Sequence, residues 1–82
     1  MTRGVVKMAN PTRGLFAIED EHGEFTIAEL LSATDIELGD VLEGDLHSLG
    51  SETFAKVRSK NSVRVFVEDI HASAARAREM LR

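Results

Sequence analysis

Residues 4–28 read GVVKMANPTRGLFAIEDEHGEFTIA. Three β-branched or alternating segments, Gly4–Met8, Leu15–Ile18 and Glu24–Ala28, are separated by the turn signals NPTRG and EDEHG. Alternation with a period of two is typical of a strand that buries one face. The stretch therefore predicts three consecutive antiparallel strands joined by hairpins.

The same alternation predicts which side chains face the core. We expect Phe16 and Ile18 to share the inner face of the second strand. On the third strand we expect Phe25 and Ile27 to point inward, with Thr26 and Ala28 on the outer face. The complete predicted interior consists of Val6, Phe16, Ile18, Phe25, Ile27, Leu42 and Val57.

Two further strands are expected before residue 60. A fourth strand-like region spans Val41–Leu49, where Gly44 indicates a bulge or bend, and a fifth spans Thr53–Arg58. The intervening stretch Glu29–Thr34 is ambiguous and can hold one helical turn. Five short strands favour a small closed barrel, because closure removes exposed sheet edges. We predict an all-β fold, an OB-type barrel of five antiparallel strands within residues 4–58.

The remaining sequence predicts an extra C-terminal strand and a short terminal helix. The valines of Val63–Val67 alternate on one face, and an alanine-rich segment follows Asp69 and Ser73, either of which can cap a helix. We therefore expect an OB-type barrel in residues 1–59 and a strand-helix extension in residues 60–82, packed on the same domain.

The expected helix carries an apolar stripe made of Ile70, Ala74, Ala77, Met80 and Leu81. This stripe can cover an open end of the barrel, contact a second copy of the chain or dock on a protein partner. The sequence leaves these three alternatives open.

Composition limits the class of protein. The chain has 82 residues, 43% of them hydrophobic and 29% charged, which indicates one globular domain. It has no cysteine, which excludes disulfides, thiolate zinc sites and a cysteine nucleophile. No apolar run is long enough to span a membrane and no apolar signal region leads the sequence, so we expect a cytoplasmic protein without a membrane partner.

Catalysis and cofactors find no support in the sequence. The histidines His22, His47 and His71 are scattered along the chain without a second ligand at metal spacing, so we expect structural or solvent-exposed roles for them. No serine lies in a nucleophile elbow and no glycine-rich loop can hold a phosphate. We expect a protein that is not an enzyme and that binds no cofactor or metal.

Charge is distributed unevenly along the chain, whose net charge is -4. Residues 1–55 hold three basic and eleven acidic side chains, whereas residues 56–82 hold seven basic and three acidic ones. Lys56, Arg58 and Lys60 alternate, so on an extended strand they would project from one face at intervals of about 6.8 Å. Such a stripe, which Arg64 can join, either tracks the phosphates of a single strand or is a solvated barrel face.

The segments Gly4–Ile18 and Gly23–Ala28 resemble the first three strands of a cold-shock domain. Leu38–Gly44 is similar to that family's leucine and glycine signature, and Thr53–Arg58 resembles its closing strand. This resemblance, over residues 4–58, implies an OB fold that binds single-stranded RNA or DNA. In the family, unpaired bases stack on aromatic side chains of the first three strands.

The resemblance also implies how this chain departs from the family. The positions of the stacking aromatics hold Met8, Ala9, Leu15, Ala17, Thr26, Ala28 and Glu29. Lys7, Asn10 and Arg13 are retained. Binding without stacking would rest on phosphate contacts.

We therefore expect a weak, phosphate-dominated binding module for single-stranded nucleic acid. The expected contacts are Lys7, Asn10, Arg13, Lys56, Arg58, Lys60 and Arg64. The alternative hypothesis is a protein-interaction or dimerisation module on an OB scaffold that has lost nucleic-acid binding. Its contact surface would be the C-terminal strand and helix.

Overall fold

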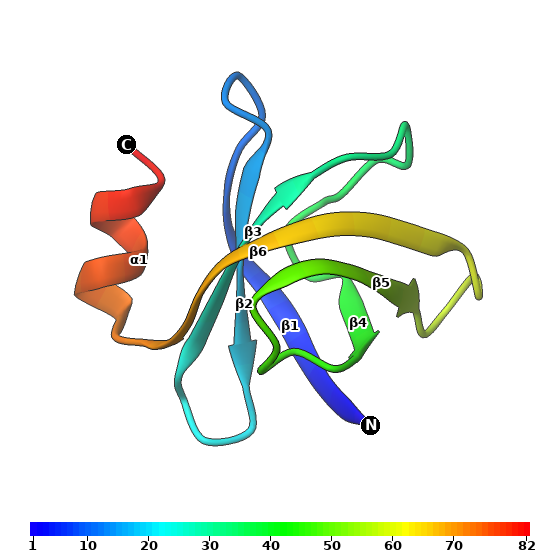
Figure 1. Ribbon diagram of the computed structural model, residues 1–82, viewed down its shortest axis with the longest axis horizontal. Coiled ribbons are helices and arrows are strands. Elements are labelled where there is room, and N and C mark those ends of the chain that lie inside the picture. The colour runs from blue at the N-terminus through cyan, green and yellow to red at the C-terminus, as the bar shows by residue number, and fades with distance from the viewer.

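The computed structural model describes residues 1–82 as six strands and one helix (Figure 1). The elements are β1 (Thr2–Asn10), β2 (Leu15–Asp20), β3 (Phe25–Leu30), β4 (Val41–Gly44), β5 (Gly50–Lys56), β6 (Ser62–Ala72) and α1 (Ala74–Met80). The strands pair antiparallel in the order β1-β2-β3-β6-β5-β4 and close into a barrel. The predicted all-β barrel with an additional C-terminal strand and a short helix is confirmed.

The barrel closes through β6. Val65 pairs with Leu30 of β3 on one side and with Glu52 of β5 on the other. Closure by five strands within residues 4–58 is therefore wrong, because β6 separates β3 from β5. Val63, Val65 and Val67 are buried, which gives β6 the apolar inner face that this position requires.

Element boundaries differ from the sequence expectations at several points. The fourth strand ends at Gly44, and the fifth runs over Gly50–Lys56 instead of reaching Arg58. The possible helical turn within Glu29–Thr34 is absent, because β3 continues to Leu30. The sixth strand extends to Ala72, so the helix cap is Ser73, whose Oγ accepts the N–H of Arg76.

The interior of the barrel forms the larger of two apolar clusters. It consists of Val6, Phe16, Ile18, Ala28, Leu42, Leu46, Phe54, Val63, Val65 and Val67. The inward positions predicted for Val6, Phe16, Ile18 and Leu42 are confirmed. Val57 is only half-buried, because it lies in the turn after β5.

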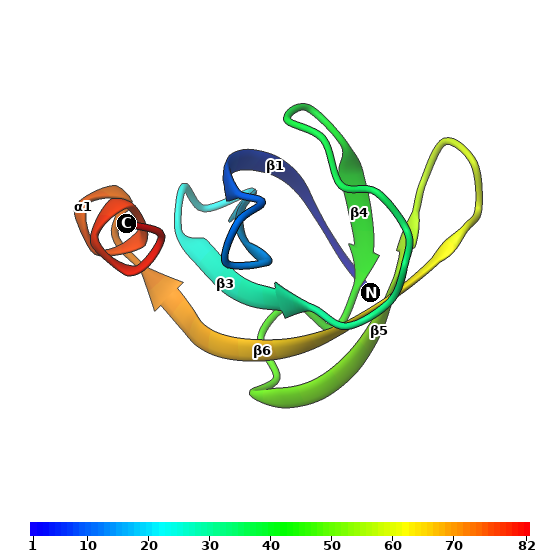
Figure 2. The same ribbon diagram turned by 90° about the horizontal axis from the view of Figure 1, so that it is seen from above.

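The second apolar cluster lies outside the barrel, beneath α1. Figure 2 shows the helix beside the barrel wall. The cluster contains Ala17, Phe25, Ile27, Ala72, Ala77 and Leu81. The helix therefore buries its Ala77 and Leu81 side against strands β2 and β3.

The prediction for the two faces of β3 is wrong. Thr26 pairs with Ile18 and Ala28 pairs with Phe16, and directly opposed residues share a face, so both point into the barrel. The Thr26 hydroxyl donates to the carbonyl oxygen of Leu46 at 2.8 Å. Phe25 and Ile27 contribute to the cluster under α1 instead. Because both faces of β3 are buried, alternation of polar and apolar residues could not tell them apart.

We expect β6 to be indispensable and α1 to be only stabilising. A chain truncated after Asn61 loses β6, leaves the edges of β3 and β5 unpaired, and should be unfolded. A chain truncated after Ala72 should remain folded but less stable by several kcal/mol, because each large apolar side chain loses about 1.5–3 kcal/mol of burial. Circular dichroism and urea unfolding measure both effects. A cooperative unfolding transition in the shorter chain would contradict closure through β6.

Candidate nucleic-acid interface and histidine cluster

Met8, Leu15 and Ala17, three of the positions that the cold-shock resemblance assigns to base stacking, lie under α1, whereas Thr26 and Ala28 point into the barrel. Ala17 is fully buried in the cluster under the helix, and Met8 and Leu15 pack against it. Small or flexible side chains at these places let the helix approach the sheet closely. Unpaired bases therefore cannot stack on this part of the surface while α1 is docked.

Asn10 and Arg13 bind the C-terminal end of α1. The Asn10 side-chain amide donates to the carbonyl oxygen of Leu81 at 2.7 Å. The Arg13 guanidinium donates to the main-chain oxygen of Met80 at 3.0 Å and to that of Arg82. The last carbonyls of a helix have no partners within it, and a cation there complements the helix dipole. Both residues, predicted as nucleic-acid contacts, thus fix the helix on the β1–β2 turn.

The segment from Lys56 to Lys60 is a turn, so the predicted extended stripe is wrong. The Lys60 amide donates to the Lys56 carbonyl at 2.8 Å, and the Lys56 amide donates to the Asn61 carbonyl at 2.9 Å. Lys60 has a φ of 67°, in the left-handed region. The chain thus reverses between β5 and β6 and does not present alternate side chains on one face.

The turn nevertheless places basic side chains along one groove. Arg3, Lys56 and Arg58 line a groove of about 330 Å³ together with Gly39, Asp40, Val41 and Val57, which we call the basic groove. Nε of Arg3 lies 2.8 Å from Oε2 of Glu43, and Nζ of Lys56 lies 3.4 Å from Oδ2 of Asp40. Arg58 is exposed and has no acidic partner.

Charges near the basic groove act on Glu43. The hydrogen bond from Arg3 holds the pKa of Glu43 below its ordinary value of 4.5, and the charge of Lys60 acts in the same direction. Lys60 ends the turn that begins at Lys56, to whose carbonyl its amide donates, and its side chain is exposed and without an ion-pair partner. Arg3, which sequence reasoning did not single out, joins the basic groove because β1 pairs with β4.

Lys7 and Arg64 lie apart from the basic groove. Lys7 lies in a neighbouring depression together with Glu19 and Glu21. Arg3 lines both this depression and the basic groove. Arg64 is on β6, in a depression with Leu31 and Glu52. The structure therefore brings together Lys56, Arg58 and Lys60 of the predicted contacts and separates them from Arg64.

Phe66 was also missed by the sequence analysis. It is 41% exposed, whereas Phe16, Phe25 and Phe54 are buried. Val65 and Val67 on either side of Phe66 face inward, which places Phe66 on the outer face of β6. This alternation is the sequence signal that could have identified Phe66 as exposed.

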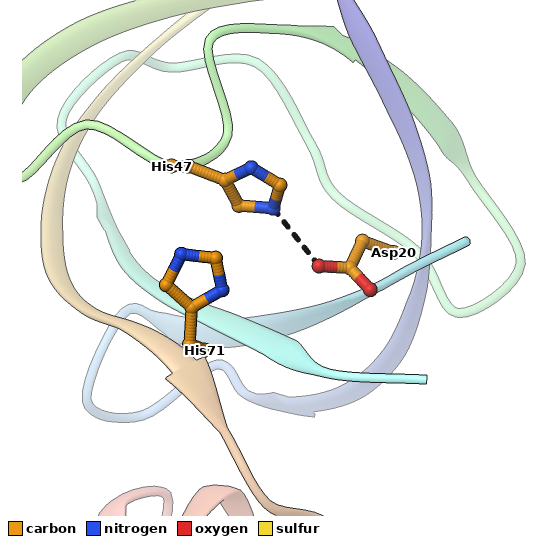
Figure 3. A group of neighbouring side chains, drawn as sticks. All are labelled: Asp20, His47 and His71. Atoms are coloured by element: carbon orange, nitrogen blue, oxygen red, sulfur yellow. Dashed lines mark hydrogen bonds and ion pairs between the residues drawn. The ribbon is translucent and has the colours of Figure 1, made fainter. Parts of the chain in front are cut away.

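Asp20, His47 and His71 converge from three separate segments (Figure 3). Nε2 of His47 lies 2.9 Å from Oδ2 of Asp20. The two imidazole rings stack with centroids 4.6 Å apart and planes inclined by 30°. One potential ligand atom from each of the three residues lies within 4.8 Å of the others. His47 and His71, which are far apart in the sequence and have no second ligand at metal spacing there, thus lie together in the fold, whereas the His22 side chain is 69% exposed and stays outside the cluster.

Asp20 is fixed by the β2–β3 turn. Its Oδ1 accepts the backbone N–H groups of His22 at 2.9 Å and Glu24 at 3.0 Å, and its side chain is 1% exposed. Burial acts to raise the pKa of Asp20, but the hydrogen bonds from His47 and from these two amides outweigh it. The pKa therefore lies below its ordinary value of 3.8, and the group is a carboxylate at neutral pH.

Comparison with known proteins gave no matching family model, no matching curated protein and no matching solved structure. The closed six-strand barrel is compatible with an OB-like fold. The one helix, α1, is neither long nor apolar enough to cross a membrane. Function must therefore be argued from the residues of the chain itself.

We expect Asn10→Ala to loosen the C-terminal end of α1. The substitution removes the bond to Leu81 and the bond that Asn10 Oδ1 accepts from the Arg13 amide. Stability should fall by about 1–2 kcal/mol, measured by urea unfolding, and amide exchange should accelerate first in α1. Lys7→Ala, at an exposed position without a hydrogen bond, is the matched control and should change stability by less than about 0.5 kcal/mol. Equal effects of the two changes would contradict the docking role of Asn10.

Proposed function

We propose that this chain is a cold-shock-like, non-catalytic module that binds single-stranded RNA or DNA weakly, through phosphates at the basic groove. The supporting observation is the gathering of Arg3, Lys56 and Arg58 along one groove, with Lys60 close by. This positive region lies on a chain whose net charge is -4. A local basic patch on an acidic protein is an electrostatic footprint for a polyanion.

The binding energy in this proposal is electrostatic. Arg58 and Lys60 have no acidic partners and can contact phosphate directly, and the Arg58 guanidinium can do so with two parallel hydrogen bonds. Lys56 and Arg3 must exchange Asp40 and Glu43 for phosphate, which reduces their net contribution. No aromatic platform adds a salt-insensitive contribution, because α1 covers that face. The result is weak binding without base preference.

Salt dependence tests this proposal. Contacts to about three phosphates of a single strand give a slope of about -2 for log K against log salt, so affinity should fall about 20-fold between 50 and 200 mM salt. Arg58→Gln combined with Lys60→Gln should bring the slope to about -1. The measurement is fluorescence anisotropy of a labelled single-stranded oligonucleotide.

The matched control removes the same charge from the C-terminal end of the chain, at Arg78 in α1 and at Arg82 after it. Arg78→Gln combined with Arg82→Gln changes two exposed arginines that lie outside the basic groove. This variant should keep the affinity and slope of the parent chain. If both double variants weakened oligonucleotide binding equally, net charge alone would explain the loss of affinity, and a site at the basic groove would be contradicted.

The second candidate function is self-association through the outer face of β6. Phe66 lies opposite Ser51 and Glu29, and the register places the exposed Leu31 beside Arg64 on the same face. Phe66 is flanked by Arg64 and Glu68, which are both exposed. Two copies related by a two-fold axis can therefore bury Phe66 against Phe66, with Arg64 of one copy facing Glu68 of the other. The inward valines are buried within one chain, as are Ala77 and Leu81 of the expected helix stripe, whereas Ile70 of that stripe belongs to β6, so a dimer would use this outer face.

Solution mass tests self-association. If the second candidate holds, light scattering of the parent chain should show a dimer at raised concentration, and Phe66→Thr should return it to a monomer. Leu38→Thr removes an apolar side chain that is more exposed, 65% against 41% for Phe66, from the loop before β4 and should leave the dimer intact. A monomeric parent chain would exclude this candidate without affecting the proposal for the basic groove.

A further inference from the structure

We propose that Asp20, His47 and His71 form a mononuclear Zn²⁺ site. Two imidazoles and one carboxylate are ligands that zinc prefers, and three protein ligands leave a fourth position for water or an anion. The inference does not depend on nucleic-acid binding, because none of these residues lines the basic groove.

The distances within the cluster suit a metal ion. Ligand atoms bound to zinc lie about 2.0–2.2 Å from the ion, and in a tetrahedral site they are therefore separated by about 3.4 Å. The three candidate atoms here already lie within 4.8 Å of one another, and His47 Nε2 is 2.9 Å from Asp20 Oδ2. No separation in the cluster therefore exceeds the tetrahedral value by more than about 1.4 Å.

Neighbouring groups orient the ligands in the way that metal sites require. Oδ1 of Asp20 is occupied by two backbone amides, which leaves Oδ2 directed at His47. Nδ1 of His71, the ring nitrogen nearer Asp20 in Figure 3, lies 2.9 Å from Oε1 of Glu24. This contact holds the His71 ring with Nδ1 on the side of Asp20, and zinc bound at Nδ1 would take the place of the Glu24 contact.

The backbone at His71 adds an independent observation. Its φ is 54°, so a residue with a β-carbon adopts the left-handed conformation at the end of β6. Such strained conformations persist where the surroundings hold them, and they gather at functional sites. In Figure 3 the His71 ring, carried on this kinked backbone, lies beside the His47 ring.

An ion at this site would connect distant parts of the chain. Asp20 ends β2, His47 belongs to the loop after β4, and His71 lies near the end of β6. His71 is two residues before Ser73, the cap of α1. Zinc would therefore fix the segment from which the helix departs, as well as offering one open coordination position.

Titration with the metal alone tests the proposal. The full chain, without an affinity tag and after treatment with a chelator, is titrated with ZnCl₂ by calorimetry and with CoCl₂ by visible absorption. We expect one ion per chain and the intense absorption bands of four-coordinate cobalt. Zinc at 100 times its dissociation constant should raise Tm by about 10 °C or more, because it binds the folded state alone.

Two variants test the histidines separately. His47→Gln keeps an amide that can donate to Asp20, and His71→Asn keeps a residue that tolerates a positive φ. Each removes a direct ligand, so affinity for zinc should fall more than the about 10- to 100-fold that is typical of losing an outer-shell partner. His22→Ala is the matched control, because this exposed histidine lies outside the cluster and its backbone amide is unchanged.

The outcomes separate clearly. Stoichiometric binding that both cluster variants lose and His22→Ala retains would establish the site. Absence of binding to the parent chain would overturn the proposal. It would also be overturned if His22→Ala abolished binding, or if His47→Gln and His71→Asn, shown to be folded by circular dichroism, bound zinc like the parent chain.

Discussion

The β3 strand is buried on both faces, and the other elements are arranged around this constraint. Thr26 and Ala28 fill the barrel interior, whereas Phe25 and Ile27 need a cover on the outside. The helix supplies that cover, and β6 must pass beside β3 before the chain can reach the helix position. Burial of apolar side chains on both sides gives a domain of 82 residues two apolar clusters in place of one.

The inner face of a strand was predictable where its larger apolar side chains point into the barrel, as on β2, where only the small Ala17 is buried in the second cluster. Alternation of Phe16 and Ile18 gave the correct inner face of β2, and the alternating valines gave β6. It failed on β3, because Thr26 is polar yet buried through its bond to Leu46. Closure through β6 was also beyond a local pattern, since it depends on which distant strands meet.

The candidate sites were predictable only in part, for related reasons. Basic residues near the end of β5 were recognisable from charge, but their arrangement depends on the left-handed Lys60, which turns the chain. Asn10 and Arg13 were visible as polar residues of a turn, yet their partners are carbonyls at the other end of the chain. The histidine cluster joins positions 20, 47 and 71, a separation that no short motif reveals.

The docking of α1 on β2 and β3 has a consequence for how such a chain can change. The helix can pack on the barrel only because residue 17 is small. A large aromatic ring at position 17 would occupy the space of Ala77 and Leu81. Loss of the helix alone would leave an apolar surface in water. One substitution therefore cannot create an aromatic surface on the barrel, because the docked helix occupies the space. Introducing aromatic side chains and removing the helix must occur together. The helix is tethered to this face by the chain itself, so it covers the face at a high effective concentration.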